Sequence, residues 1–203
     1  MNESQRQIDA LEAYAGEQVY GLQWGDPEVD AWLRPVLDWI YPQLGPEKVV
    51  VEIGCGGGRW SRYFQHVKLA YLVDATPKAE ALIRQHCTCS SFFYLLSSDG
   101  HLPEISDGSV DYVFTFDVFV HFERGLFDAY LKEIARVMKP NGVLHLHHAI
   151  DIGSEHNPEC FKYRDPLEID DTLKGLGFQM SSRRMFFRGG YGSTLVECFR
   201  DVK

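Results

Sequence analysis

The sequence lacks several features that mark specialised classes of protein. Its five cysteines, at positions 55, 87, 89, 160 and 198, show neither the paired CxxC spacing of a zinc site nor the density of a disulfide scaffold. No apolar run approaches the roughly 18 residues that span a bilayer, and residues 1–10 lack the apolar stretch of a secretory signal. We therefore expect a cytoplasmic protein with reduced thiols and no membrane partner.

Positive charge is also scarce. The chain has 29 acidic residues against 20 Lys and Arg, a formal net charge of −9, which repels a phosphate backbone unless basic residues cluster. The short cluster Arg183, Arg184 and Arg188 has the pattern of a solvated strand face. We therefore expect a small-molecule partner and no nucleic acid, and we leave the oligomeric state open between monomer and homodimer.

What the chain does contain is the composition of an ordinary globular protein. Hydrophobic residues make up 45% and charged residues 24% of its 203 residues, a length typical of one domain. Internal repeats and low-complexity segments are absent from the sequence. We divide the chain into an N-terminal helical cap, residues 1–45, and a ligand-binding domain, residues 46–203.

Segments with strand and helix character alternate along the second part. Val49–Ile53 is a β-branched run, typical of a parallel strand covered on both faces, and the glycine-rich stretch Gly54–Gly58 follows it. We expect further strands at residues 69–73, 92–96, 110–116 and 143–147, and helices after the glycines (through Trp60, Tyr63, Phe64 and Val67), from Thr76-Pro77, and over 126–138. Repeated βα units predict a parallel sheet.

The two ends of the chain differ from this rhythm. After Asp26, apolar residues at 29, 32, 33, 36, 37 and 40 predict an amphipathic helix. Residues 150–164 are polar and aperiodic, and Asp165-Pro166 predicts a helix start. Strands at 178–187 and 194–199, joined through Gly189–Gly192, predict an antiparallel hairpin at the sheet edge. The expected fold is a doubly wound, mostly parallel seven-stranded α/β sheet with an antiparallel last strand.

Polar and glycine residues collect at the expected carboxyl ends of the strands, where open α/β sheets bind ligands. Glycines let the backbone approach a ligand, and an acidic residue about 20 positions later can accept hydrogen bonds from ribose hydroxyls. Gly54 and Asp74 have this spacing. Arg59 stands where the dinucleotide pattern GxGxxG needs its third glycine, so that fingerprint is broken.

The pattern acidic-x-G-x-G-x-G, formed by Glu52, Gly54, Gly56 and Gly58, resembles motif I of the class I S-adenosylmethionine-dependent methyltransferases. The resemblance continues in chain order through Asp74, Ser98-Asp99-Gly100, the stretch 110–121 and the turn 136–144, and it covers roughly residues 48–200. Asn141 replaces the usual glycine of that turn, which is tolerable because Asn accepts a left-handed conformation. The chain is thus similar to the small-molecule branch of the family.

The resemblance implies a Rossmann-like methyltransferase fold with S-adenosylmethionine as cofactor. It implies that Asp74 holds the ribose, that Asp99 contacts the adenine amine, and that Glu52 faces the donor's ammonium group directly or through water. For Glu52 the alternative is a buried carboxylate satisfied by backbone amides. The cofactor-binding residues expected are Glu52, Gly54, Cys55, Gly56, Gly58, Asp74, Ala75, Ser98, Asp99, Gly100, Asp117 and Val118.

Histidines supply the candidate general bases. His121 lies four residues beyond Asp117, where a short turn could aim it into the crevice; the alternative is a histidine packed beside Phe122. His147 and His148 end a strand and point to opposite faces, so we expect one of them to face the acceptor. A further grouping, His145, His147, His148, Asp151 and His156, matches no standard ligand spacing, and we predict no metal.

The sequence also favours oxygen over nitrogen as the atom that is methylated. Amino-methylating DNA enzymes of the family carry (Asp/Asn)-Pro-Pro-Tyr after the fourth strand, whereas residues 117–120 read Asp-Val-Phe-Val, which favours oxygen. The stretches 20–27 and 57–60 resemble bacterial methyltransferases of surface-sugar or secondary-metabolite pathways, and Tyr14, Tyr20 and Trp24 could form a lid or simply pack. We predict methylation of a small-molecule hydroxyl. A nicotinamide-dependent oxidoreductase and a non-catalytic nucleoside-binding module on the same fold remain alternatives.

Overall fold

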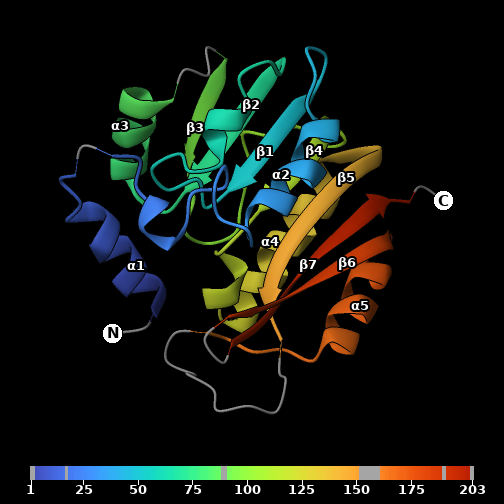
Figure 1. Ribbon diagram of the computed structural model, residues 1–203. Coiled ribbons are helices and arrows are strands. Elements are labelled where there is room, and N and C mark those ends of the chain that lie inside the picture. The colour runs from blue at the N-terminus through green and yellow to red at the C-terminus, as the bar shows by residue number, and fades with distance from the viewer. Residues whose placement is uncertain (1–2, 17, 88–90, 151–160, 189–190, 202–203) are drawn as a thin grey trace.

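The computed structural model describes residues 3–16, 18–87, 91–150, 161–188 and 191–201, and their strands form one sheet in the order β3-β2-β1-β4-β5-β7-β6 (Figure 1). Strands β1 to β5 are parallel, and β7 runs antiparallel to both β5 and β6. The bounds are β1 Val49–Ile53, β2 Leu69–Asp74, β3 Phe92–Leu96, β4 Val110–Thr115, β5 Met138–Ala149, β6 Phe178–Arg188 and β7 Tyr191–Arg200. The expected doubly wound sheet with an antiparallel last strand is confirmed.

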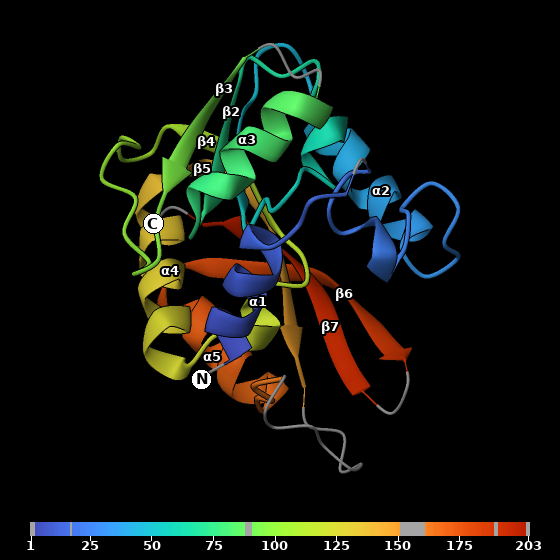
Figure 2. The same ribbon diagram turned by 90° about the vertical axis from the view of Figure 1, so that its left-hand side faces the viewer.

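Helices cover both faces of this sheet (Figure 2). Alternate strand residues point to opposite faces, so Val50 and Val51 belong to two different core clusters. One cluster joins the sheet to α2 and α3, and the other joins it to α4 and α5. The helices are α1 Glu3–Glu12, α2 Arg34–Ile40, α3 Pro77–His86, α4 Arg124–Val137 and α5 Pro166–Gly175.

Two helix starts lie where the sequence predicts them. The Thr76 hydroxyl accepts a hydrogen bond from the backbone N–H of Lys78 at 3.2 Å, and the Asp165 carboxylate accepts one from Leu167 at 2.9 Å. A proline follows each cap in the first helical turn, where its missing N–H costs nothing. The left-handed conformation expected at Asn141 is also present, with φ of 61°.

The helix predicted directly after Asp26 is wrong. Asp26 accepts from the N–H of Glu28 and pairs with Arg62, and Asp30 accepts from the N–H of Trp32. These local bonds favour turns over a helix, so α2 begins only at Arg34. Its buried face consists of Val36, Leu37 and Ile40, as the spacing predicts, whereas Val29 and Trp32 of the predicted face lie before the helix and are exposed.

The helix predicted after the glycines is also wrong, because only a short 3-10 helix, Ser61–Tyr63, forms there. The side chains that suggested it are nevertheless buried: Trp60, Phe64 and Val67 all belong to the core. Tertiary bonds hold this segment instead of a regular helix, since the Ser61 hydroxyl donates to Glu52 and Arg59 reaches Asp117.

Several expectations concern residues outside the described ranges. They are those for Cys89, Asp151, His156, Cys160, Gly189 and Gly190.

The loop after β1 depends on glycine geometry. Gly54 has φ of +76°, and a Cβ built on it would lie 2.1 Å from a methyl carbon of Val118 in the loop after β4. The backbone of one loop therefore approaches the side chain of the other so closely that only glycine fits.

Strand β5 buries three histidines. His145 Nδ1 lies 2.8 Å from the Tyr112 hydroxyl and its Nε2 lies 2.9 Å from Glu197. His148 points to the opposite face, edge-on to Phe127, and its Nε2 has no hydrogen-bond partner among the described residues. Burial lowers the pKa of His148 to about 3, so His148 stays neutral in the folded protein.

Replacing Gly54 by alanine should destabilise the fold more than replacing Gly108. Both glycines have positive φ, and a Cβ on Gly108 meets nothing within 4 Å. Each variant loses about 1–2 kcal/mol to the left-handed conformation, and Gly54→Ala loses about 1–3 kcal/mol more to overpacking against Val118. Thermal unfolding of the two variants tests this, and equal melting temperatures would contradict the close approach.

His148 should make folding stability depend on pH. Its pKa is about 3 in the fold against 6.5 normally, so the unfolded chain binds more protons below pH 6.5 and the folded state loses stability as pH falls. The His148→Leu variant should therefore gain on the wild type by about 1.4 kcal/mol per pH unit between pH 6 and 4. Unfolding titrations measure this, with exposed His66→Leu as control; parallel curves for wild type and His148→Leu would refute it.

A candidate active site at the carboxyl ends of the strands

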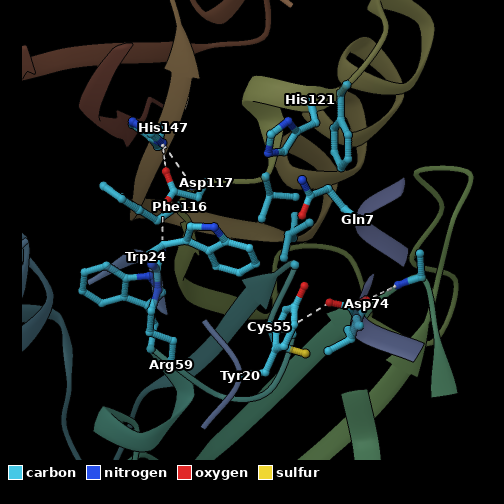
Figure 3. A pocket seen from close by; sticks show the side chains of 18 of the residues that line it. Gln7, Tyr20, Trp24, Cys55, Arg59, Asp74, Phe116, Asp117, His121 and His147 are labelled. Atoms are coloured by element: carbon cyan, nitrogen blue, oxygen red, sulfur yellow. Dashed lines mark hydrogen bonds and ion pairs between the residues drawn. The ribbon is translucent and has the colours of Figure 1, made fainter. Parts of the chain in front are cut away.

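A cavity of about 710 Å³ opens beside the carboxyl ends of β1, β2, β4 and β5. The loops that follow β1, β2 and β4 line it, together with α1, the segment before α2 and the β6–β7 hairpin. Figure 3 shows Asp74, Cys55 and Tyr20 at one end and Phe116, Asp117 and His147 at the other. From β1 the sheet continues to β2 and β3 on one side and to β4 and β5 on the other. The cavity therefore lies beside β1 at the topological switch point, where such sheets bind ligands.

The structure brings most of the predicted site residues together. Those that line the cavity are Gly54, Cys55, Gly56, Asp74, Ala75, Ser98, Asp117, Val118, His121 and His147. Those outside its lining are Glu52, Gly58, Asp99, Gly100 and His148.

Asp74 is bonded to the glycine loop. One carboxylate oxygen accepts from the backbone N–H of Gly56 at 2.8 Å, and the other accepts from Ala75 at 2.8 Å. Burial raises the pKa of Asp74, while these backbone bonds act in the opposite direction. A Cβ on Gly56 would meet nothing closer than a Tyr20 ring carbon at 3.7 Å, so this backbone borders open space that a ligand can fill.

Glu52 lies beneath the loop instead of in the cavity. It is 2% exposed, and its carboxyl group accepts a hydrogen bond from the Ser61 hydroxyl. Burial raises its pKa to about 8, so the group is mostly protonated at neutral pH. Its hydrogen-bond partner is thus a side-chain hydroxyl, which neither expectation for this residue included.

The other residues outside the lining shape the backbone. A Cβ on Gly58 would lie 2.3 Å from the Cys87 sulfur on the α3 side, and one on Gly100 would lie 2.7 Å from Ala129 of α4. Asp99 is exposed and accepts from the backbone N–H of His101 at 3.1 Å. In this arrangement the Asp99 side chain stabilises a turn.

Asp117 and Arg59 form an ion pair at the end of the cavity that Phe116 and His147 line. Arg59 Nη2 donates to Asp117 at 2.6 Å, and its Nη1 donates to the Gly21 carbonyl at 3.3 Å. Burial opposes ionisation of Asp117, but the charge and hydrogen bond of Arg59, together with His147 and His121, outweigh it and hold the pKa of Asp117 below its usual value. Asp117 has a left-handed backbone with φ of 60°, a strained conformation that other contacts must hold.

His147 has both ring nitrogens occupied. Its Nδ1 accepts from the backbone N–H of Asp117 at 3.1 Å, so Nε2 carries the proton, 2.8 Å from the Ser193 hydroxyl oxygen. Burial lowers the pKa of His147 to about 4. The ring is therefore neutral and fixed in one tautomer, and the alternation of β5 sends His148 to the far face.

His121 ends the 3-10 helix Phe119–His121, whose turn closes with a hydrogen bond from the His121 N–H to the Val118 carbonyl at 3.0 Å. Its ring borders the cavity (Figure 3) and stacks on Phe161, with centroids 5.5 Å apart. Phe122 stacks instead on Tyr130. The short turn therefore directs His121 toward the crevice.

The segment before β1 contributes directly to the cavity. Tyr20 and Trp24 line it, and Tyr14 packs edge-on against Tyr20 with centroids 5.0 Å apart. The Tyr20 hydroxyl is buried without a hydrogen-bond partner in the described part of the chain, so a ligand could satisfy it. The packing interpretation is thus confirmed for Tyr14 and Tyr20, and the lid interpretation stays a prediction.

Some lining residues were missed by sequence reasoning. Gln7 and Leu11 come from α1, and Phe186 and Ser193 come from the hairpin. No local pattern marks them, because their position depends on strand register and on where α1 lies. Arg59 is visible in the sequence as a cation directly after the glycines. The sequence analysis uses it against a dinucleotide-binding fingerprint and does not predict its ion pair.

The described residues contain neither a cluster of metal ligands nor a membrane-spanning helix. No group of three or more His, Cys, Asp or Glu side chains could hold a metal there. No helix within those ranges is long and apolar enough to cross a membrane.

Known structures share this fold over almost the whole chain. A methyltransferase of Haloferax volcanii, solved in complex with the Trm112 methyltransferase activator, is 14% identical with a TM-score of 0.71, covering 100% of this chain and 99% of that one. The 1,6-didemethyltoxoflavin-N1-methyltransferase of Burkholderia thailandensis was solved with bound 1,6-didemethyltoxoflavin and S-adenosylhomocysteine. It is 17% identical with a TM-score of 0.68, and the match covers 97% of this chain and 90% of that one. An S-adenosylmethionine-dependent methyltransferase of Aquifex aeolicus is 20% identical with a TM-score of 0.65 and coverages of 96% and 97%.

Sequence comparison agrees with the fold. A family model described as a methyltransferase domain matches residues 51–146, the stretch from β1 into β5. A search of curated proteins finds no match. The domain match answers the choice between a nicotinamide enzyme, a non-catalytic module and a methyltransferase in favour of the last, with S-adenosylmethionine as cofactor. The chain is an S-adenosylmethionine-dependent methyltransferase with the class I methyltransferase fold.

Proposed function

We propose that this enzyme methylates a hydroxyl oxygen of a small molecule and that His121 removes the hydroxyl proton. The observation that carries the proposal is the position of His121, whose ring borders the cavity on the turn after β4. His147, the other histidine in the lining, is held through both ring nitrogens. A general base must reach the acceptor proton in the bound complex, and His121 fits that requirement better.

The cofactor end of the cavity suits a nucleoside with a cationic centre. Gly56 presents open backbone, and the Asp74 carboxylate can accept hydrogen bonds from ribose hydroxyls. The Tyr20 hydroxyl, which has no hydrogen-bond partner among the described residues, offers another polar contact. When bound, S-adenosylmethionine supplies an electrophilic methyl group on a positively charged sulfur. Asp74 lines the cavity and its carboxylate favours a positive charge there, whereas the charge of Asp117 is balanced by Arg59.

Oxygen is the acceptor atom that the residues support best. The neighbour from Burkholderia is an N1-methyltransferase, so the fold also serves nitrogen acceptors. In this chain Val118 and Phe119 replace the two prolines of the amino-methylating DNA enzymes. A neutral hydroxyl is a weak nucleophile that benefits from proton removal, and His121 provides a group for it.

Asp74→Ala should weaken binding of S-adenosylhomocysteine by about 1–3 kcal/mol, because it leaves the ribose hydroxyls without their acceptor. Calorimetry measures the affinity. Asp74→Asn keeps an acceptor oxygen and should lose less. Asp99→Ala, on an exposed side chain outside the lining, should change the affinity less than Asp74→Ala. Wild-type affinity in Asp74→Ala would refute the role assigned to Asp74.

His121→Gln should lower kcat by about 10² to 10⁴ because the hydroxyl proton loses its base. Release of S-adenosylhomocysteine with an acceptor chosen from a panel of hydroxylated small molecules measures the rate. Calorimetry should find the affinity for S-adenosylhomocysteine unchanged, which separates chemistry from cofactor binding. The exposed His101→Gln serves as the matched control. An undiminished kcat in His121→Gln would remove His121 as the base.

A further inference from the structure

The acceptor end of the cavity has a wall of three rings that pack against one another: Phe116, His147 and Phe186. The Phe116 and His147 rings are parallel within 7° with centroids 4.1 Å apart, and Phe186 stands edge-on to both at 5.7 Å. Each of the three is less than 10% exposed. This aromatic wall is therefore a rigid surface that borders the cavity.

Two tryptophans border the same cavity from the segment before α2. Trp24 and Trp32 both line it, and they are 46% and 45% exposed. Trp24 packs edge-on against Tyr20, with ring centroids 5.2 Å apart, and Figure 3 draws it on the same side of the view as Phe116, away from Asp74. Indole rings bury large areas when a flat ligand covers them, so these exposed faces are suited to an apolar, planar partner.

Several polar groups at this end are already engaged with one another. Arg59 donates to Asp117 and Gly21, the Ser193 hydroxyl bonds to His147, and the side-chain amide oxygen of Gln23 accepts from the Gly21 N–H. A sugar carries several hydroxyl groups, and each one buried without a partner weakens binding. The engaged side chains therefore fit a sugar poorly, whereas an aromatic molecule needs few polar contacts.

We propose that the acceptor is a planar aromatic alcohol, a phenol or hydroxylated heteroaromatic, bound between the aromatic wall and the two tryptophans. The proposal rests on the proposed function and names its substrate class. A phenolic hydroxyl has a pKa of about 10, so a histidine can assist its ionisation. The phenolic proton passes to His121, the oxygen–methyl bond forms as the sulfur–methyl bond breaks, and the sulfur leaves as a neutral thioether.

Calorimetry on the enzyme saturated with S-adenosylhomocysteine tests the substrate class with two probes, 2-naphthol and methyl α-glucopyranoside. We expect saturable, one-to-one binding of 2-naphthol and none of the glucoside. Trp24→Ala and Trp32→Ala should each weaken 2-naphthol at least tenfold. Tyr41→Ala removes an aromatic side chain of similar exposure, 47%, outside the cavity lining, and should leave the affinity unchanged.

Phe186→Leu keeps an apolar side chain of similar bulk but removes the ring, and it should weaken 2-naphthol several-fold. In Trp32→Ala and Phe186→Leu the affinity for S-adenosylhomocysteine should stay at the wild-type value, which shows that the cofactor end is intact. Equal binding of 2-naphthol by wild type and both tryptophan variants would overturn the proposal. Preference for the glucoside would overturn it too.

The same probes separate this inference from the proposed function. If 2-naphthol binds as expected but no S-adenosylhomocysteine is released from S-adenosylmethionine, the aromatic site stands and hydroxyl methylation is contradicted. If the glucoside is methylated and 2-naphthol neither binds nor competes, hydroxyl methylation stands and the aromatic substrate class is wrong.

Discussion

The buried guanidinium of Arg59 connects the chain segments that enclose the cavity. Arg59 follows the glycine loop, its ion-pair partner Asp117 follows β4, and its second acceptor, the Gly21 carbonyl, belongs to the segment before α2. A buried charge must keep its partners, because removing one leaves an uncompensated charge in a poor dielectric. The three segments are therefore held at fixed positions relative to one another.

The consequences of that ion pair extend along the acceptor end. With its carboxylate held by Arg59, Asp117 stays in a left-handed conformation and directs its backbone N–H to His147 Nδ1. That bond fixes the tautomer and plane of His147, and the stack on Phe116 follows from the plane. The close approach of Gly54 to Val118 places the glycine loop against the same turn. The cofactor end and the acceptor end thus share one support.

Sequence reasoning predicted what short-range patterns encode. The strand before the glycines, the caps at Thr76 and Asp165 and the burial of α2 depend on residues within one or two turns, and all are present. Alternation along β5 also predicted that His147 and His148 diverge, although not which of them faces the cavity. The spacing of apolar residues predicts helices after Asp26 and Gly58. That prediction is wrong because the spacing carries no information about the side-chain hydrogen bonds that replace a helix there.

The rest depends on long-range geometry. Phe186 and Ser193 reach the cavity only through the register of the hairpin, in which they pair with each other across β6 and β7. The division of the chain at residue 45 stays a prediction, and Leu37 and Ile40 share one core cluster with Val50 and Leu72 of the sheet. The described part of residues 1–45 therefore packs against the sheet, and Leu11, Tyr20 and Leu33 among them form part of the cavity wall.

The two ends of the cavity differ in how far a short sequence motif specifies them, and this difference has a physical basis. The proposed cofactor end is built from backbone groups and one carboxylate within a single strand–loop–strand unit, from Gly54 to Asp74, so a short motif specifies it. The proposed acceptor end is built from side chains of α1, the segment before α2 and the hairpin, which only the complete fold brings together. Substitutions at the acceptor end can alter the shape of that space without disturbing the glycine loop. One cofactor site can therefore serve many acceptors on the same fold, and the identity of the acceptor has to be sought in the aromatic side chains and not in the motif.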